Sequence, residues 1–145
     1  MSNNKNIEAI YELSPMQQGM LFHSIYQENS GNYFEQISVT LAGDLNVSIF
    51  KSSWKEILQR HSVLRTSFVY KKIDKMLQIV HENLELPFFF EDWSAEQKED
   101  HVNRIKEFLK KDKKLGFNLN KAPLLRIYLI KVDFYKLEIL IQMFT

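Results

Sequence analysis

The sequence predicts a single layered α/β (α+β) domain, in which helices pack on a mixed β-sheet. The chain has 145 residues, the usual size of one domain, and no Pro/Gly/Ser-rich linker divides it. Segments with helical apolar spacing alternate with strand-like segments along the chain. Aromatic residues make up 13% of the composition, which suits a core built between sheet and helix faces.

The first predicted helix begins at Ser14 and runs to about Gln27. Ser14 supplies a capping hydroxyl, Pro15 occupies the first helical position, and Gln17 completes a capping box. Gly19 costs roughly 1 kcal/mol against alanine in a helix, so we expect it to permit a close backbone contact. The expected buried stripe consists of Met16, Met20, Leu21 and Ile25.

A strand, a second helix and a β-hairpin are expected next. Residues 35–41 alternate polar and apolar side chains as a half-buried strand does. The helix from about Asn46 has an apolar face on which His61 also falls. Residues 64–70 and 76–81 have the composition of two hairpin strands. The apolar face of the helix consists of Val47, Phe50, Trp54, Ile57 and Leu58.

The second half of the chain predicts a short strand, a charged helix and two apolar strands. Residues 86–90 are the short strand, and Ser94 with Gln97 forms a capping box for a helix that ends near Gly116. The narrow apolar stripe of that helix consists of Val102, Ile105, Phe108 and Leu109. The two apolar segments, which we expect to be central strands, are residues 124–132 and 137–144.

Composition excludes several classes of protein. The net charge of +1 gives no global field for nucleic acid or an anionic membrane. No apolar run approaches the roughly eighteen residues that span a bilayer. Cysteine is absent, which removes disulfides and thiolate chemistry and suits a reducing cytoplasm. We therefore expect a soluble cytoplasmic protein with no nucleic-acid and no membrane partner.

The residues alone predict no catalytic constellation and no metal site. No two histidines have the HxH, HxxH or HExxH spacing of metal ligands. With four glycines, the chain contains neither a GxSxG motif nor a phosphate-binding loop. We expect His101 to be exposed and His23 to be packed or partly exposed. The four histidines are His23, His61, His81 and His101.

Several segments, taken in order, resemble the core motifs of one enzyme family. LSPMQQGMLFHS at 13–24 is similar to a first core motif, and YFEQ at 33–36 stands where that family often has the same letters. RHSVLRTSF at 60–68 matches the pattern RHxxLRTxF at every fixed position, and LGFNLNKAPLLRIYLIK at 115–131 is similar to a later segment. Over nearly its whole length, the chain resembles the condensation domain of non-ribosomal peptide synthetases.

The resemblance implies a two-lobed fold like chloramphenicol acetyltransferase, with a tunnel between the lobes. Residues 13–145 would be the N-terminal lobe, ending before the HHxxxDG motif that supplies the family's catalytic histidine. The implied reaction joins aminoacyl or peptidyl thioesters, each held on the phosphopantetheine arm of a carrier protein, with no cofactor bound directly. No residue of this chain is then catalytic, and we expect the fragment alone to be inactive.

The resemblance also assigns roles to six residues. Arg60, His61 and Arg65 would be structural groups that hold the lobe and the histidine loop in place. From the residues alone, compensation of charge at the helix end with one buried arginine is the favoured interpretation. The residues expected in the tunnel wall or its packing are Met16, Met20 and His23.

Partners follow from the same resemblance. Residues 1–12 look like the docking segment that begins some synthetase subunits, which would bind the C-terminal segment of an upstream subunit. Carrier proteins are the other expected partners, and exposed apolar surface or a strand edge on an isolated lobe would favour self-association. Two alternatives remain open: a non-catalytic interaction module, and an acyltransferase of the same fold that acts on other substrates.

Overall fold

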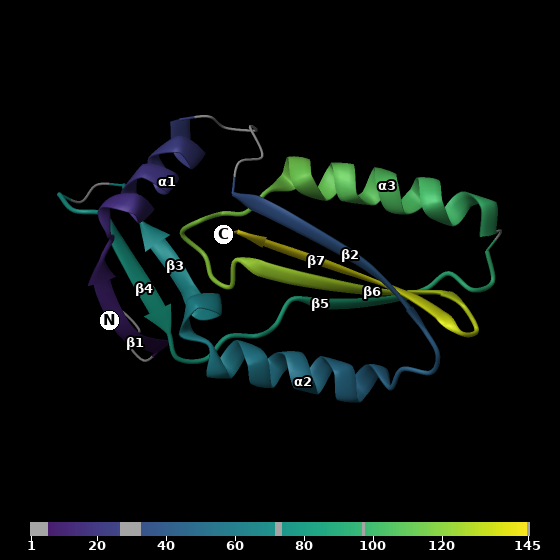
Figure 1. Cartoon of the computed structure of the whole chain (residues 1–145). Helices are drawn as coiled ribbons and strands as arrows, with labels where there is room; N and C mark the ends of the chain where they lie inside the picture. Colours follow the sequence, from purple (N-terminus) through teal and green to yellow (C-terminus); the bar gives the residue numbers. More distant parts are fainter. Residues whose placement is uncertain (1–5, 27–32, 72–73, 97, 145) are drawn as a thin grey trace.

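The computed structural model describes residues 6–26, 33–71, 74–96 and 98–144 (Figure 1). The elements in these ranges are β1 (Ile7–Glu12), α1 (Pro15–Tyr26), β2 (Phe34–Ala42), α2 (Val47–Arg60), a 3₁₀ turn η2 (Ser62–Arg65), β3 (Thr66–Val69), β4 (Leu77–His81), β5 (Phe88–Asp92), α3 (Lys98–Leu115), β6 (Leu125–Asp133) and β7 (Lys136–Phe144). No helix in the described ranges is both long and apolar enough to cross a bilayer.

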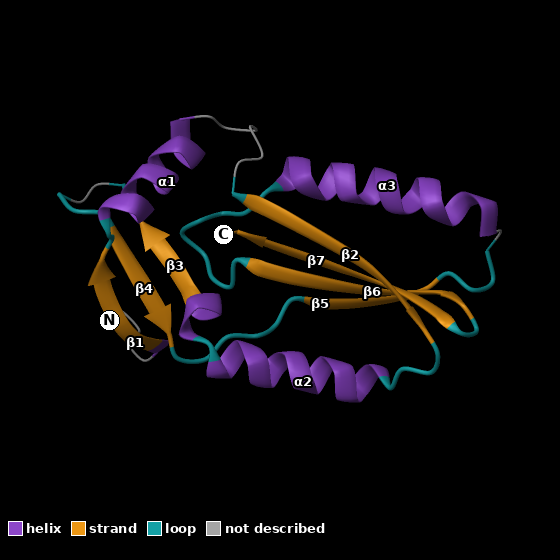
Figure 2. Cartoon of the chain, in the orientation of Figure 1, coloured by secondary structure: helices purple, strands orange, loops and turns teal. Residues whose placement is uncertain are grey.

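The strands form two sheets. The larger sheet has the order β2-β7-β6-β5, in which β5 and β6 run parallel and the other pairs are antiparallel. The smaller sheet has the order β1-β4-β3 and is antiparallel throughout. Helices α2 and α3 lie on opposite sides of the larger sheet, while α1 lies beside the smaller one (Figure 2). The predicted mixed α and β layered fold is confirmed.

The core lies on both faces of the larger sheet. The side chains of β6 alternate between these two faces, because successive side chains of a strand point to opposite faces of its sheet. Leu125 and Ile127 pack with Leu58 of α2, whereas Ile130 packs with Trp93 and the apolar stripe of α3. Strands covered on both faces are apolar at nearly every position. This explains the composition of β6 and β7, and their predicted central positions are confirmed.

The predicted starts of α1 and α2 are correct. The Ser14 N–H donates to Gln17 Oε1 at 2.9 Å, and the Gln17 N–H donates to Ser14 Oγ at 3.3 Å, which closes the capping box of α1. Asn46 caps α2 by accepting the Ile49 N–H at 3.0 Å. The predicted start of α3 at Ser94 is wrong: α3 begins at Lys98, and Ser94 lies in a turn where its N–H and hydroxyl donate to Asp92 Oδ1. Gln97, the other member of the predicted capping box, lies outside the described residues.

Two predictions for α1 are wrong. Met16 is 77% exposed, so it does not belong to the buried stripe, which is centred on Leu21. A Cβ atom added at Gly19 would meet no atom within 4 Å, so this glycine permits no close approach. Both errors have the same cause: α1 packs on one side only, against a small sheet, and most of its surface remains exposed.

The predicted stripe of α3 is confirmed at Ile105, Phe108 and Leu109, which pack against the core, but two other predictions for this helix are wrong. His101, expected on the surface, is buried at 5% exposure, and Val102 of the expected stripe is 60% exposed. The His101 ring lies 5.9 Å from the buried Trp93 ring, while Asp112 is drawn inward by Arg126. Apolar periodicity alone does not reveal that these two polar side chains are buried.

The predicted docking segment overlaps a strand of the fold. Residues 7–12 form β1, which pairs with β4 along its length. Because β1 is an edge strand with five of its six residues exposed, no apolar alternation marks it in the sequence. The docking role of residues 1–12 stays a prediction, and residues 1–5 lie outside the described ranges.

Candidate functional site

A cavity of about 560 Å³ lies between α1, the smaller sheet and the carboxyl end of β7. Met20 and Leu21 of α1 form one wall, Phe68 and Val80 of the smaller sheet form another, and Phe144 closes the cavity at the end of β7. Figure 1 shows this end of β7 directed toward α1 and β3. The lining is predominantly apolar, as in typical small-molecule sites.

Only one of the three residues expected in the tunnel wall lines the cavity. Met20 lines the cavity. Met16 and His23 are exposed and do not belong to the lining. The cavity residues that the sequence did not single out include Phe68, Val80 and Gln78, which come from the β3–β4 hairpin. The period-two alternation of side chains in that hairpin could have indicated that these residues share one face of the sheet. It could not have indicated that α1 covers this face.

Two glutamine side chains form an amide pair in the cavity wall, whose other polar members are Tyr11, Ser62 and Thr66. Gln17 Nε2 donates to Gln78 Oε1 at 3.3 Å, and Gln78 Nε2 donates to Gln17 Oε1 at 3.4 Å. Gln17 also accepts the N–H of Ser14 as part of the capping box. The pair therefore joins the first turn of α1 to the start of β4.

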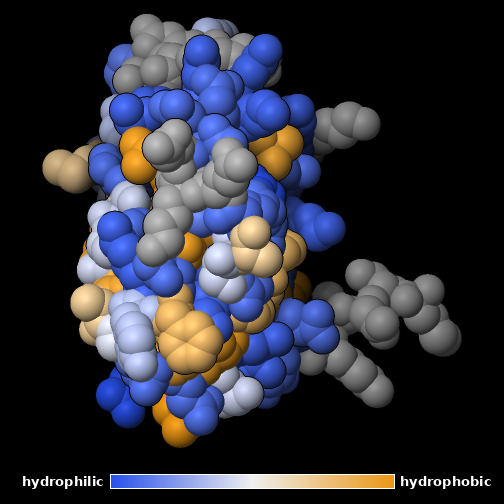
Figure 3. All heavy atoms as spheres, turned by 90° about the vertical axis from the view of Figure 1, so that its right-hand side faces the viewer, coloured by the Kyte–Doolittle hydropathy of each residue, from blue (hydrophilic) through white to orange (hydrophobic). Residues whose placement is uncertain are grey.

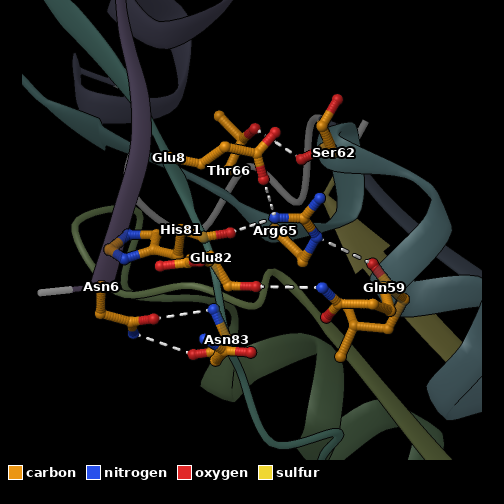
Figure 4. Close-up of polar contacts among 10 residues, drawn as sticks. Asn6, Glu8, Gln59, Ser62, Arg65, Thr66, His81, Glu82 and Asn83 are labelled. Carbon is orange, nitrogen blue, oxygen red and sulfur yellow. Dashed lines mark hydrogen bonds and ion pairs between the residues drawn. The ribbon is translucent and has the colours of Figure 1, made fainter.

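Arg65 is the centre of a buried polar network beside the cavity (Figure 4). Its side chain is 5% exposed, and its Nη1 lies 2.6 Å from Glu8 Oε2 of β1. Nε donates to the carbonyl of Leu58 at 3.1 Å, and Nη1 also donates to the carbonyl of His81. One guanidinium thus links α2, β1 and β4, because its planar donors reach three elements at once.

The other two members of the predicted basic cluster do not enter this network. Arg60 and His61 are exposed. His61 contributes through its backbone, since its N–H donates to Ile57 O at 3.0 Å and ends α2. The interpretation drawn from the residues alone, one buried arginine beside a charged helix end, describes the local structure. Whether the three residues hold a histidine loop stays a prediction.

His81 makes a further, partly buried contact that the sequence did not indicate. Its Nε2 lies 2.8 Å from the Oγ of Ser67, which is 1% exposed. Burial holds the pKa of His81 below its ordinary value of 6.5, and a hydrogen bond to the backbone of Asn6 partly opposes this. The neutral ring can accept a hydrogen bond from the Ser67 hydroxyl at Nε2, whereas the protonated ring can only donate one.

We expect the free energy of unfolding to decrease as the pH falls through 6.5. The unfolded histidine has its ordinary pKa and binds a proton more readily than folded His81. Stability is therefore full above the unfolded pKa and is lost below it, as the pH approaches the lower folded value. Urea unfolding between about pH 8 and pH 5.5 measures how steeply the free energy of unfolding depends on pH. His81→Gln should make this pH dependence less steep, whereas His61→Gln, at an exposed position, should not. An equal pH dependence in the unsubstituted protein and both variants would contradict the assignment of the effect to His81.

Within the described ranges, no group of three or more His, Asp or Glu side chains could hold a metal ion. The site is therefore described by an apolar cavity, an amide pair at its wall and a buried arginine network behind it. Such a site can bind and orient a chain. The described residues bring no nucleophile, base and orienting acid together in the cavity wall.

This architecture is that of one lobe of a condensation domain. The solved starter condensation domain of rhizomide synthetase superposes with a TM-score of 0.80 at 19% sequence identity, over 94% of this chain and 34% of that one. The model of the condensation domain family matches residues 7–143. The chain belongs to the condensation domain family.

Named relatives support the same conclusion. One of the linear gramicidin synthase proteins of Brevibacillus parabrevis is 38% identical over 132 residues, and bacitracin synthase 1 of Bacillus licheniformis is 39% identical over 127. These matches cover 91% and 88% of this chain. The chain spans only 2% of the length of each of those proteins. The resemblance to condensation domains of non-ribosomal peptide synthetases is thereby confirmed.

Proposed function

We propose that this chain is the N-terminal lobe of a condensation domain that joins two carrier-bound thioesters through an amide bond. The observation that carries the proposal is the apolar cavity at the carboxyl end of β7, walled by α1 and the smaller sheet. A lobe of this family needs such a wall because two tethered reactants must be held in an orientation that allows attack.

The proposed reaction forms one bond and breaks one. The amine nitrogen of the acceptor thioester attacks the carbonyl carbon of the donor thioester, so that a C–N bond forms and the C–S bond breaks. The donor arm leaves as a thiol, which takes up the proton that the amine loses. The phosphopantetheine arms of the carrier proteins are substrates in this scheme. The 145 residues contain no adjacent histidine pair, and we assign no catalytic residue to them.

The proposed partners follow from the reaction. Carrier proteins deliver both thioesters, and residues 1–12 dock an upstream subunit in the cytoplasm. Self-association would use the edge strands, where Ile37 and Val39 of β2 and Phe89 and Phe90 of β5 are 41–46% exposed. The end of the molecule at the β6–β7 turn shows apolar residues only as separate patches among hydrophilic ones (Figure 3).

An assay of amide-bond formation tests the proposal. The synthetase subunit that contains this lobe is supplied with two loaded carrier proteins, and the product is measured by mass spectrometry. We expect product from the subunit and none from the 145-residue chain alone. Met20→Trp fills the cavity and should lower the rate about tenfold or more by displacing the bound chain. Phe22→Trp is the matched control, since Phe22 lies on the same helix, is 48% exposed and does not line the cavity.

Three results would contradict the proposal. Absence of product from the correctly folded subunit would exclude condensation. A rate unchanged by Met20→Trp would remove the cavity from the reaction. Binding of carrier proteins without any product would instead support the non-catalytic interaction module.

A further inference from the structure

The cavity beside β7 has a wall without charge. Among the described residues that line it, none is Asp, Glu, Lys, Arg or His. Aliphatic and aromatic side chains, such as Leu21, Val80 and Phe144, supply most of the surface. The buried guanidinium of Arg65 is engaged by Glu8 and two carbonyls and is not part of the lining.

Three of the five polar side chains of the lining are hydrogen-bonded within the protein, and the other two, Tyr11 and Ser62, are uncharged hydroxyls. Gln17 and Gln78 pair with each other through both amides. Thr66 donates its hydroxyl to the Ser62 carbonyl at 2.9 Å. The polar side chains of the lining therefore provide no ionic partner for a ligand.

A charged chain in this cavity would lose its hydration without gaining a countercharge, which is strongly unfavourable. An apolar chain would lose no hydrogen bonds and would gain contact with the lining. The volume of about 560 Å³ falls within the usual range of small-molecule sites, roughly 300–1,000 Å³. It can hold an entire side chain or a short acyl chain.

We propose that this cavity binds the uncharged, apolar chain of a carrier-bound thioester, and that Gln78 determines this specificity. The inference rests on the proposed function and adds the substrate class to it. Gln78 lies on β4, where its amide is held by Gln17 in a neutral pair facing the cavity. A carboxylate at this position would place the first charge in the wall.

Competition between thioesters tests the specificity. The synthetase subunit is offered leucyl, lysyl and glutamyl thioesters on the same carrier protein, and the kcat/KM of each is compared. We expect leucyl to exceed lysyl and glutamyl by about tenfold or more. Gln78→Glu should raise the kcat/KM of lysyl relative to leucyl by about tenfold, because a half-buried carboxylate in the wall can pair with the ammonium group. Asn103→Asp makes the same charge change on the exposed surface of α3 and should leave the ratio unchanged.

A binding measurement on the chain itself separates this inference from the proposed function. The methyl NMR signal of Met20, which lines the cavity, is followed while leucyl, lysyl or hexanoyl pantetheine amide is added. We expect shifts with the leucyl and hexanoyl compounds and none with the lysyl compound. A response to hexanoyl alone would identify an acyl chain as the occupant, and a response to leucyl as well would show that a side chain suffices.

The outcomes are distinct. Selective binding by the chain, with no amide product from the subunit, would overturn the proposed function and support the apolar site. Condensation that uses lysyl as well as leucyl, or a ratio that Gln78→Glu does not change, would overturn the apolar specificity while the function remained. Equal shifts of Met20 with leucyl and lysyl compounds would also overturn it.

Discussion

Arg65→Ala is expected to lower the free energy of unfolding by about 3 kcal/mol. The guanidinium is nearly inaccessible and donates to the carbonyls of Leu58 and His81, which would lose this partner. A buried polar group without a partner costs roughly 1–3 kcal/mol. Glu8 adds less, because its side chain is 46% exposed and can be hydrated after the change. Denaturant unfolding of the chain gives the difference directly.

Two further variants make the test of Arg65 specific. Arg60→Ala removes an exposed arginine from the adjoining helix end and should change stability by no more than about 0.5 kcal/mol. Arg65→Lys keeps the charge but cannot reproduce the forked donors, so we expect an intermediate loss. Equal stabilities of the Arg65→Ala and Arg60→Ala proteins would show that the network is not a major support of the fold. In the synthetase subunit, Arg65→Ala should also lower condensation or solubility.

Features encoded by neighbouring residues could be predicted from the sequence. The Ser14–Gln17 capping box and the Asn46 cap lie within one turn of their partners. The two apolar strands at the end of the chain needed only their composition. The motif at 60–68 singled out Arg65, although nothing local indicated which atoms it would bind.

Features that depend on distant pairing could not be predicted. Arg65 meets Glu8 across 57 residues, and Gln17 meets Gln78 across 61. Gln142, with 0% exposure, occupies the register position between Gln36 of β2 and Arg126 of β6. Period-two patterns place such side chains on a face, but only the strand order brings them together. The candidate cavity was missed for the same reason, since α1, η2, the three strands of the smaller sheet and β7 all contribute to its lining.

Asp112→Ala is expected to lower the free energy of unfolding by about 3–5 kcal/mol, the usual effect of breaking a buried ion pair by removing one partner. Asp112 is 5% exposed, and its Oδ1 accepts from Arg126 Nε at 2.8 Å. Arg126 also donates to the carbonyls of Asp112 and Gly116 at 3.1 and 2.8 Å, and its guanidinium lies 4.2 Å from the centre of the Phe117 ring. The change would leave an uncompensated arginine with a side chain only 12% exposed.

Matched variants separate the ion pair from a general effect on the helix. Glu107→Ala removes an exposed carboxylate from the same helix and should have little effect on unfolding in urea. Asp112→Asn retains an acceptor for Arg126 but not the charge, so its loss should be smaller than that of alanine. In a double-mutant cycle with Arg126→Met, the two changes should be non-additive by at least about 1 kcal/mol, because removing both partners leaves no unpaired charge. Additive losses would mean that Asp112 stabilises α3 independently of Arg126, and the pair would then not be what fastens this helix to β6.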